Sequence, residues 1–205
     1  AGPMPAVAGT PSHERARLVE GERRPITALC SALMPAAGVE LEDLDELVHL
    51  QQEICADVAN RYRGQLVGGL GHQVLIEFGY PVAREDDALR AARAALAIRT
   101  AVAERNARVG AAARLEIRVG IHTGIVAYGP NESARRSAGQ IVGMTPMIAS
   151  QLNARAPRGA IVASAATAQL LRSHFVLSSI GSQAIDGMAR ELELFALDSE
   201  RATVR

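Results

Sequence analysis

Apolar and polar positions along the chain predict an alternation of strands and helices. Residues 26–33 form a short apolar run without helical spacing, which is typical of a buried strand. From residue 41 to residue 58 the apolar positions recur at helical spacing, so we expect an amphipathic helix. Two apolar runs, 65–67 and 74–78, flank the glycine-rich segment 68–71, and this pattern predicts a hairpin.

The middle of the chain continues the same alternation. A second long helix is expected from Glu85 to about Ala107, followed by two strands, 115–121 and 124–128, that meet at His122-Thr123. The resulting βαββαβ order, with one extra strand, predicts an α+β ferredoxin-like sheet with helices on one face. Further downstream we expect a helix over 143–154, a strand over 160–162, a short helix over 165–171, and strands near 175–177 and 192–195.

Composition limits the classes of protein that the chain can represent. Its 205 residues, 48% of them hydrophobic, suffice for one globular domain over 23–198, with a linker at 1–22 and a tail at 199–205. Basic and acidic residues both number 22, so no overall positive field recruits nucleic acid. No apolar run is long enough for a membrane span, and we expect no membrane insertion.

The two cysteines give a second limit. Cys30 and Cys55 lie inside apolar segments and have neither the spacing of metal ligands nor that of a redox pair. The sequence shows no signal-peptide pattern, and we expect none. The simplest interpretation is a soluble, reducing, cytoplasmic setting.

Four ordered motifs resemble the bacterial class III adenylate/guanylate cyclase homology domain across residues 22–198. They are Gly21-Glu22-Arg23-Arg24, Phe78-Gly79-Tyr80-Pro81 with Glu85-Asp86-Asp87-Ala88, the segment Arg118 to Gly129, and Leu192-Glu193-Leu194-Phe195. The resemblance implies a dimer with two symmetric sites at its interface. In each site one chain supplies two aspartates for two divalent ions, and the other supplies base-reading groups, an asparagine and an arginine. Metal activation and neutralisation of the triphosphate charge explain that demand.

The positions implied for metal and base binding carry unsuitable side chains. Ala32 stands in place of the aspartate of the first strand, and His72 in place of the aspartate of the hairpin. Alanine cannot ligate a hard cation, and imidazole is a poor ligand for magnesium. Gly68 replaces a base-reading lysine, while Gln140 stands where an aspartate or threonine is common and can still hydrogen-bond a base edge. We therefore predict no metal and no cofactor.

The positions implied for transition-state support are also changed. Met147 replaces the asparagine and Gln151, one helical turn later, replaces the arginine. Asp186 replaces a phosphate-facing lysine, and its carboxylate would repel a triphosphate. Loss of a single oxyanion donor costs roughly 2.7–4 kcal/mol. Because all of these groups are absent together, we expect no cyclase turnover.

Other polar or unusual residues receive structural interpretations. We expect His122 to be a structural hydrogen-bonding residue, and Met144 and Met147 to pack in a dry interface. Arg135-Arg136 are interpreted as solvated charges rather than as a phosphate clamp. The acidic cluster Glu85-Asp86-Asp87 is interpreted as a helix start rather than as a metal site.

Three hypotheses for function follow. The favoured one is a pseudoenzyme that acts as a dimerisation, interaction or regulatory module in intracellular signalling, as a homodimer or with a fused or neighbouring signalling domain. The second is a sensor that binds a nucleotide or another small molecule in the remodelled interface cleft through Gln140, Gln151 and His72. The third is residual or altered cyclase activity.

Overall fold

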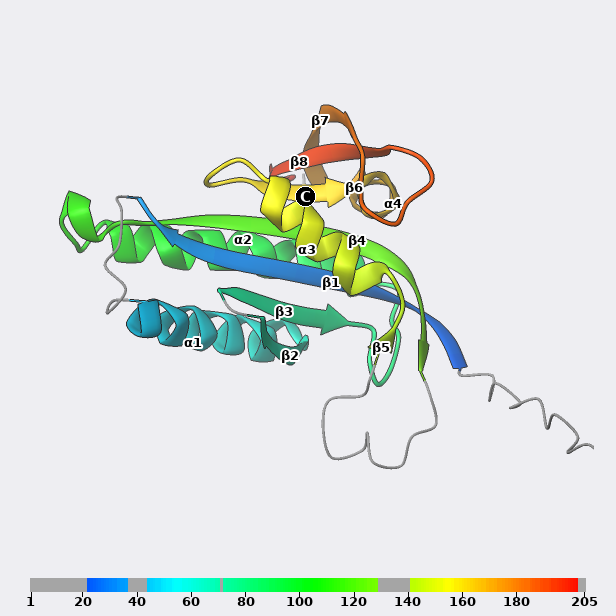
Figure 1. The fold of residues 1–205 in the computed structure, drawn as a ribbon, viewed down its shortest axis with the longest axis horizontal. Coiled ribbons are helices and arrows are strands. Elements are labelled where there is room, and N and C mark those ends of the chain that lie inside the picture. The colour runs from blue at the N-terminus through cyan, green and yellow to red at the C-terminus, as the bar shows by residue number, and fades with distance from the viewer. Residues whose placement is uncertain (1–21, 37–43, 71, 129–140, 203–205) are drawn as a thin grey trace, which may run out of the picture.

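The structure, a computed structural model, describes residues 22–36, 44–70, 72–128 and 141–202. Residues 1–21 of the predicted linker, Gln140 and Arg135-Arg136 lie outside this range. The elements, labelled in Figure 1, are β1 (Glu22–Pro35), α1 (Leu44–Tyr62), β2 (Gln65–Leu70), β3 (Gln73–Phe78), α2 (Asp87–Asn106), the 3-10 turn η2 (Ala111–Ala113), β4 (Leu115–Tyr128), β5 (Ile141–Val142), α3 (Thr145–Arg155), β6 (Ile161–Ser164), α4 (Ala165–Leu171), β7 (Phe175–Gln183) and β8 (Leu192–Glu200).

One mixed sheet organises these elements. Its strand order is β2-β3-β1-β4-β6-β8-β7, and the short β5 pairs with the end of β4. All neighbouring strands are antiparallel except β4 and β6, which run parallel. This arrangement confirms the predicted α+β plan. Within the described residues, no helix is long and apolar enough to cross a membrane.

The predicted break at His122-Thr123 is wrong, because β4 is one continuous strand. β1 pairs with β4 over its whole length, so His122 lies opposite Ala28 and Thr123 lies opposite Thr27. The two polar residues and Gly124 indicated a turn, but the uninterrupted partner strand keeps the backbone extended. The same pairing extends β1 beyond the predicted 26–33.

Two other boundaries differ from prediction. Gly68 and Gly69 belong to β2 instead of forming the turn, with a register shift between Leu66 and Gly68. Gly68 has a φ of +146°, a conformation that favours glycine. At the far end of the chain, β8 extends to Glu200 and so includes two residues of the predicted tail.

The two faces of the sheet are covered differently, as Figure 1 shows. The α1 and α2 helices pack on one face, as predicted, where Leu29, Ile76 and Phe78 meet the alanine-rich side of α2 in the main core. The α3 helix lies on the opposite face, where Ala28 and Cys30 pack against Ala149. Successive strand residues point to opposite faces, so Leu29 and Cys30 belong to different cores.

The α3 helix approaches the sheet closely because Gly120 has no side chain. A β-carbon added at Gly120 would lie 2.2 Å from the carbonyl oxygen of Ala149 and 2.4 Å from the backbone nitrogen of Asn153. Only glycine permits this approach of helix backbone to strand. The glycine therefore positions the helix that carries Met147 and Gln151.

Candidate functional site

Ala32 lies on the α3 face of the sheet, between neighbouring strands. In register it stands opposite Gln73 of β3 and Arg118 of β4, and it is 1% exposed. Residues directly opposite in an antiparallel pair share a face, so Arg118 is the cationic neighbour of this position. The Arg118 Nε is buried and has no hydrogen-bond partner in the described part of the chain. An apolar side chain beside a guanidinium offers nothing to a divalent cation.

His72 lies between β2 and β3 and is exposed. Its neighbour Gln73 contacts α3: the Ser150 hydroxyl donates a 2.6 Å hydrogen bond to Gln73 Oε1, and Gln73 Nε2 donates to Asn153 Oδ1 at 3.4 Å. Among the described residues, no group of three or more histidine, cysteine, aspartate or glutamate side chains could hold a metal ion. His72 therefore belongs to no such group in the part of the chain that the structure describes.

Gln151 is hydrogen-bonded to the backbone of Asp186. The Asp186 N–H donates to Gln151 Oε1 at 2.9 Å, and Gln151 Nε2 donates to the Asp186 carbonyl at 3.2 Å. Arg155 also donates to Gln151 Oε1, at 3.0 Å, and its guanidinium lies 4.0 Å from the Asp186 carboxylate. The side chain of Gln151 and the backbone of Asp186, both at positions expected to contact a triphosphate, are thus bonded to each other.

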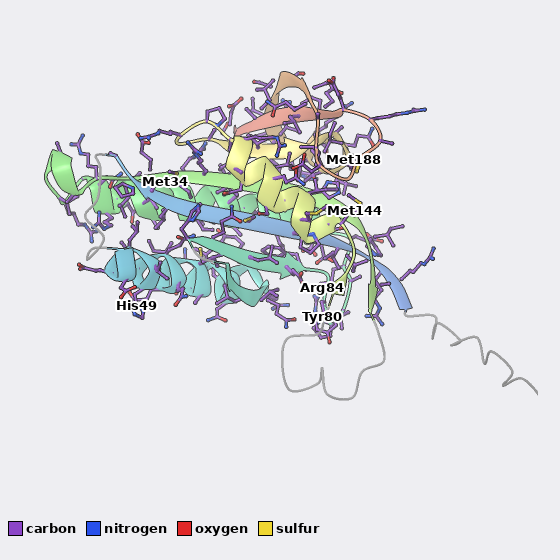
Figure 2. The ribbon with its side chains drawn as sticks, viewed as in Figure 1. Met34, His49, Tyr80, Arg84, Met144 and Met188 are labelled. Carbon is purple, nitrogen blue, oxygen red and sulfur yellow. The ribbon has the colours of Figure 1, made fainter. Side chains whose placement is uncertain are left out.

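The β7–β8 loop (residues 184–191) also contacts the first turn of α3 through methionines. A β-carbon added at Gly187, which has a φ of +83°, would lie 2.8 Å from the ε-methyl of Met144 and 3.4 Å from that of Met147. Figure 2 labels Met144 at the start of α3 and Met188 in the loop. Met144 and Met147 remain 37% and 42% exposed, so the predicted dry interface is not formed within this single chain.

A small cavity of about 280 Å³ lies between the sheet and α3. Gln151 contributes to it, but His72 is not among its lining residues, so the polar groups proposed for a sensor are not gathered there. The Ser150 hydroxyl and the Gln73 amide in its wall already bond to each other. Its volume is at the lower limit of typical small-molecule pockets, about 300–1,000 Å³. The lining residues are Cys30, Gln73, Leu75, Pro146, Met147, Ser150 and Gln151.

Cys30 borders this cavity as an unreactive thiol. Burial raises its pKa to about 12, although a hydrogen bond with Ser150 acts in the opposite direction. Burial likewise raises the pKa of Cys55 to about 11. Because the thiolate is the nucleophilic form, neither cysteine has the properties of a catalytic residue.

Asn153 is an important contact that sequence reasoning missed. Its Nδ2 donates to the carbonyl of Arg118 at 2.6 Å and to that of Cys30 at 3.1 Å, so it joins α3 to both central strands. The residue is 1% exposed. A lone asparagine in a helix gives no strong signal, although its spacing with the buried positions of α3 could have indicated a polar group facing the sheet.

His122 makes the kind of contact expected of a structural residue. Its Nδ1 lies 2.8 Å from the hydroxyl oxygen of Ser164, whose side chain caps α4 by accepting from the Thr167 N–H. Burial lowers the pKa of His122 to about 4. The imidazole is therefore neutral at physiological pH and joins β4 to the start of α4.

Glu77 lies on the same face, on the other side of Ala28 from His122. Ala28 pairs with Glu77 on β3 and with His122 on β4. Glu77 is 1% exposed, and its Oε1 has no hydrogen-bond partner among the described residues. Burial raises the pKa of this carboxyl to about 7. Glu77, Ala28 and His122 thus form one row across three strands. Burial disfavours the charged forms of both the acid and the base in this row.

The acidic cluster before α2 acts as a helix start, as predicted. Asp86 is the N-cap residue, and Asp87 Oδ2 accepts a 2.7 Å hydrogen bond from the Arg84 N–H. Arg90, one turn into the helix, pairs with both Asp86 and Asp87. The carboxylates of Asp86 and Asp87 are thus paired with groups at the start of α2.

Comparisons with known proteins agree with this fold. The family model of the adenylate and guanylate cyclase catalytic domain matches residues 26–199. The adenylyl cyclase CyaB from P. aeruginosa is 24% identical over 91% of this chain and 100% of its own, with a TM-score of 0.77. The guanylyl cyclase Cya2 is 25% identical over 89% of this chain and 95% of its own, also with a TM-score of 0.77.

A third similar structure is the adenylate/guanylate cyclase/hydrolase from Silicibacter pomeroyi, which is 23% identical over 86% of this chain and 97% of its own, with a TM-score of 0.69. Comparison with curated protein sequences gives no significant match. The family model spans most of the sequence, including β4, all the helices and β1 from Ile26 onward. The chain therefore belongs to the family of adenylate and guanylate cyclase catalytic domains.

Proposed function

We propose that this domain is a catalytically inactive cyclase homology domain that acts as a dimerisation, interaction or regulatory module in intracellular signalling. The observation that carries the proposal is the pairing of Gln151 with Asp186. An arginine and a lysine at these positions would bring positive charge to a triphosphate, whereas here an amide and a backbone segment satisfy each other. The replaced site is stabilised without a nucleotide.

The metal positions support the same conclusion. Ala32 is buried beside the Arg118 guanidinium, and His72 is exposed without acidic partners in the described residues. Phosphoryl transfer relies on positioning and on neutralisation of charge by metal ions and cations. With each lost donor costing roughly 2.7–4 kcal/mol, the combined losses exceed what residual binding could offset.

The domain is also unsuited to complete the site of an active partner chain. In the family arrangement each site takes its metal ligands from one chain and its transition-state groups from the other. This chain lacks both sets, at Ala32 and His72 and at Met147 and Gln151. Either site of a mixed dimer would be incomplete.

The direct test is a cyclase assay on the purified chain with ATP or GTP and with manganese or magnesium. We expect no cyclic nucleotide above a protein-free blank. A matched variant, His72→Ala with Gln151→Ala, separates this site from a contaminant. Turnover that follows the protein through gel filtration and disappears in the double variant would show that the site is active and would refute the proposal.

The proposed dimerisation is tested separately by analytical ultracentrifugation. Met147 is 42% exposed and lines the cavity, and the family resemblance places its position in a site at the dimer interface. We expect Met147→Glu to lower the dimer fraction, because a carboxylate would be buried in an apolar contact. Leu170→Glu is the control, because Leu170 is 52% exposed on α4 and does not line the cavity. A monomeric parent chain at high concentration would exclude self-association.

The sensor remains a second candidate because the cavity between the sheet and α3 is open to small molecules. The cavity is small, at about 280 Å³, and the Ser150 and Gln73 side chains in its wall bond to each other. Both features favour the inactive module over a nucleotide sensor. Isothermal titration with ATP, GTP and cyclic nucleotides in the absence of metal separates the two. Saturable heat that is lost in Gln151→Ala would favour the sensor.

A further inference from the structure

The contact between the β7–β8 loop and α3 depends on two thioether side chains. The ε-methyl groups of Met144 and Met147 both lie over Gly187, within 2.8 and 3.4 Å of the position that a β-carbon would occupy there. The loop segment beside them is anchored by the buried Ile185, which packs with Ile148 and Leu152 of α3. The two methyl groups thus cover the solvent-facing edge of the contact between loop and helix, and the cluster around Ile185 forms its buried part.

Both methionines are exposed in the single chain, as is Met188 of the same loop, which is 38% exposed. Met144 is 37% exposed and Met147 is 42% exposed, whereas Cys30 and Cys55 are 2% and 0% exposed. The pKa values of these thiols, raised by burial, keep them protonated at neutral pH. Thioether oxidation needs no deprotonation, only access of the oxidant to sulfur. The susceptibility of this region to peroxide therefore lies in its methionines and not in its cysteines.

We propose that Met144 and Met147 are reversible oxidation sites, and that their sulfoxides loosen the contact between the β7–β8 loop and the start of α3. The oxidant is a hydroperoxide. With hydrogen peroxide, a sulfur lone pair attacks one peroxide oxygen, and the S–O bond forms as the O–O bond breaks. The leaving hydroxide then takes the proton of the new S–OH group, which gives the sulfoxide and water. The sulfur is oxidised by two electrons and the peroxide is reduced. A thiol-dependent methionine sulfoxide reductase reverses the step.

Oxidation opposes the contact for a physical reason. A sulfoxide is polar and must keep its oxygen hydrogen-bonded, whereas the space over Gly187 is occupied by methyl groups. The hydrogen bonds between Gln151 and Asp186 remain after oxidation, so the loop loosens at its outer edge and is not unfolded. This inference does not rest on the proposed loss of cyclase activity, because it concerns only the loop and its two thioethers.

The experiment treats the full chain with hydrogen peroxide and follows oxidation by peptide mass spectrometry. Hydrogen–deuterium exchange of the peptide containing residues 184–191 is then measured before oxidation, after oxidation, and after treatment with methionine sulfoxide reductase. We expect sulfoxide at Met144 and Met147 before any change at Cys30 or Cys55. Exchange in the loop should rise about tenfold on oxidation and return after reduction.

Variants assign the effect to the proposed sulfurs. Met144→Leu with Met147→Leu keeps apolar volume but removes both thioethers, so peroxide should leave loop exchange unchanged. Met188→Leu is the matched control, because Met188 is 38% exposed within the same loop, and this variant should respond like the parent chain. The proposal is overturned if oxidised parent protein exchanges like the reduced protein, if Met188→Leu abolishes the response, or if the cysteines oxidise first.

Discussion

The two faces of the sheet have been built by different means. On the α1/α2 face, large side chains such as Leu29 and Phe78 of the strands pack against the alanine-rich helix α2. On the α3 face, contact depends on Gly120, on hydrogen bonds from Asn153 and Gln73, and on small residues beside a cavity. The replaced positions Ala32, Met147 and Gln151 all lie on the α3 side of the sheet.

This difference separates the residues that hold the fold from the positions on which the proposed loss of cyclase chemistry rests. The α1/α2 face buries apolar area and supplies the main stability of the domain. On the α3 face several polar groups bond to each other, among them Ser150 with Gln73 and Gln151 with the Asp186 backbone. Changes at Ala32, Met147 and Gln151 therefore leave the first face intact.

The sharpest test of the comparison uses two adjacent residues of β1. Leu29→Ala should lower the free energy of unfolding by about 2–5 kcal/mol, because the side chain is fully buried in the main core. Cys30→Ala should cost about 1 kcal/mol or less, because Cys30 is smaller and borders the cavity. Urea denaturation measures both. Equal losses would contradict the distinction between the two faces.

A second test concerns the close approach of α3. Gly120→Ala should destabilise the domain by about 3 kcal/mol, because the added methyl collides with the backbone of Ala149 and Asn153. Gly110→Ala is the matched control: Gly110 has a φ of −65° and open space around its α-carbon. That variant should be neutral or more stable by up to about 1 kcal/mol. Unchanged hydrogen exchange in α3 of Gly120→Ala would refute the steric role of the glycine.

The buried acid on the α3 face predicts a loss of stability at high pH. Burial raises the pKa of Glu77 from 4.5 to about 7, so its contribution is fully present below pH 4.5 and is lost as the pH rises through 7. The difference corresponds to roughly 3 kcal/mol. We therefore expect Glu77→Gln to match the parent chain at pH 5 and to be more stable at pH 8, in urea denaturation. A constant difference across this range would exclude titration of Glu77 as the cause.

The buried base His122 predicts the opposite dependence of stability on pH. Burial lowers the pKa of His122 from 6.5 to about 4, so its contribution is fully present above pH 6.5 and is lost as the pH falls toward 4. The parent chain should lose roughly 3 kcal/mol over this window through His122. His122→Asn should show a shallower slope in the same denaturation series. Parallel curves for the two proteins would indicate that His122 is not the titrating group.

Much of the fold could be predicted because its signals are local. The helical spacing of apolar residues placed α1 and α2, and the motif from Arg118 to Gly129 indicated the family. The prediction of a break at His122-Thr123 was wrong because pairing with β1 is a long-range effect that outweighs local turn preference. The packing of α3 on the opposite face could not be assigned from periodicity, which gives a buried stripe but not its partner.

The roles of the candidate site residues stay predictions from their motif positions, and their contacts could not be predicted from the sequence. Ala32, His72 and Met147 could be assigned by their positions within motifs, whereas the bonding of Gln151 to Asp186 joins residues 35 positions apart. That contact depends on the course of the β7–β8 loop, including the φ of +83° at Gly187. The role of Asn153 was missed for a similar reason, since its acceptors are backbone carbonyls on two strands.

The smallest expected effect comes from the bond between Gln151 and the loop. Gln151→Ala removes two hydrogen bonds to the Asp186 backbone at a partly exposed position, so unfolding should become easier by only about 1 kcal/mol. Hydrogen exchange should rise in residues 184–191 while the α1/α2 face remains protected. Gln169→Ala, at an exposed position of α4, is the control and should change neither quantity.

Gln151→Arg sharpens this last test, because it restores the side chain that the family carries at this position. The guanidinium can donate to the Asp186 carbonyl but cannot accept from the Asp186 N–H, so half of the pairing is lost. We expect loop exchange between that of the parent chain and that of Gln151→Ala. Exchange as slow as in the parent chain would mean that the loop is held by its apolar contacts alone and not by the Gln151 amide.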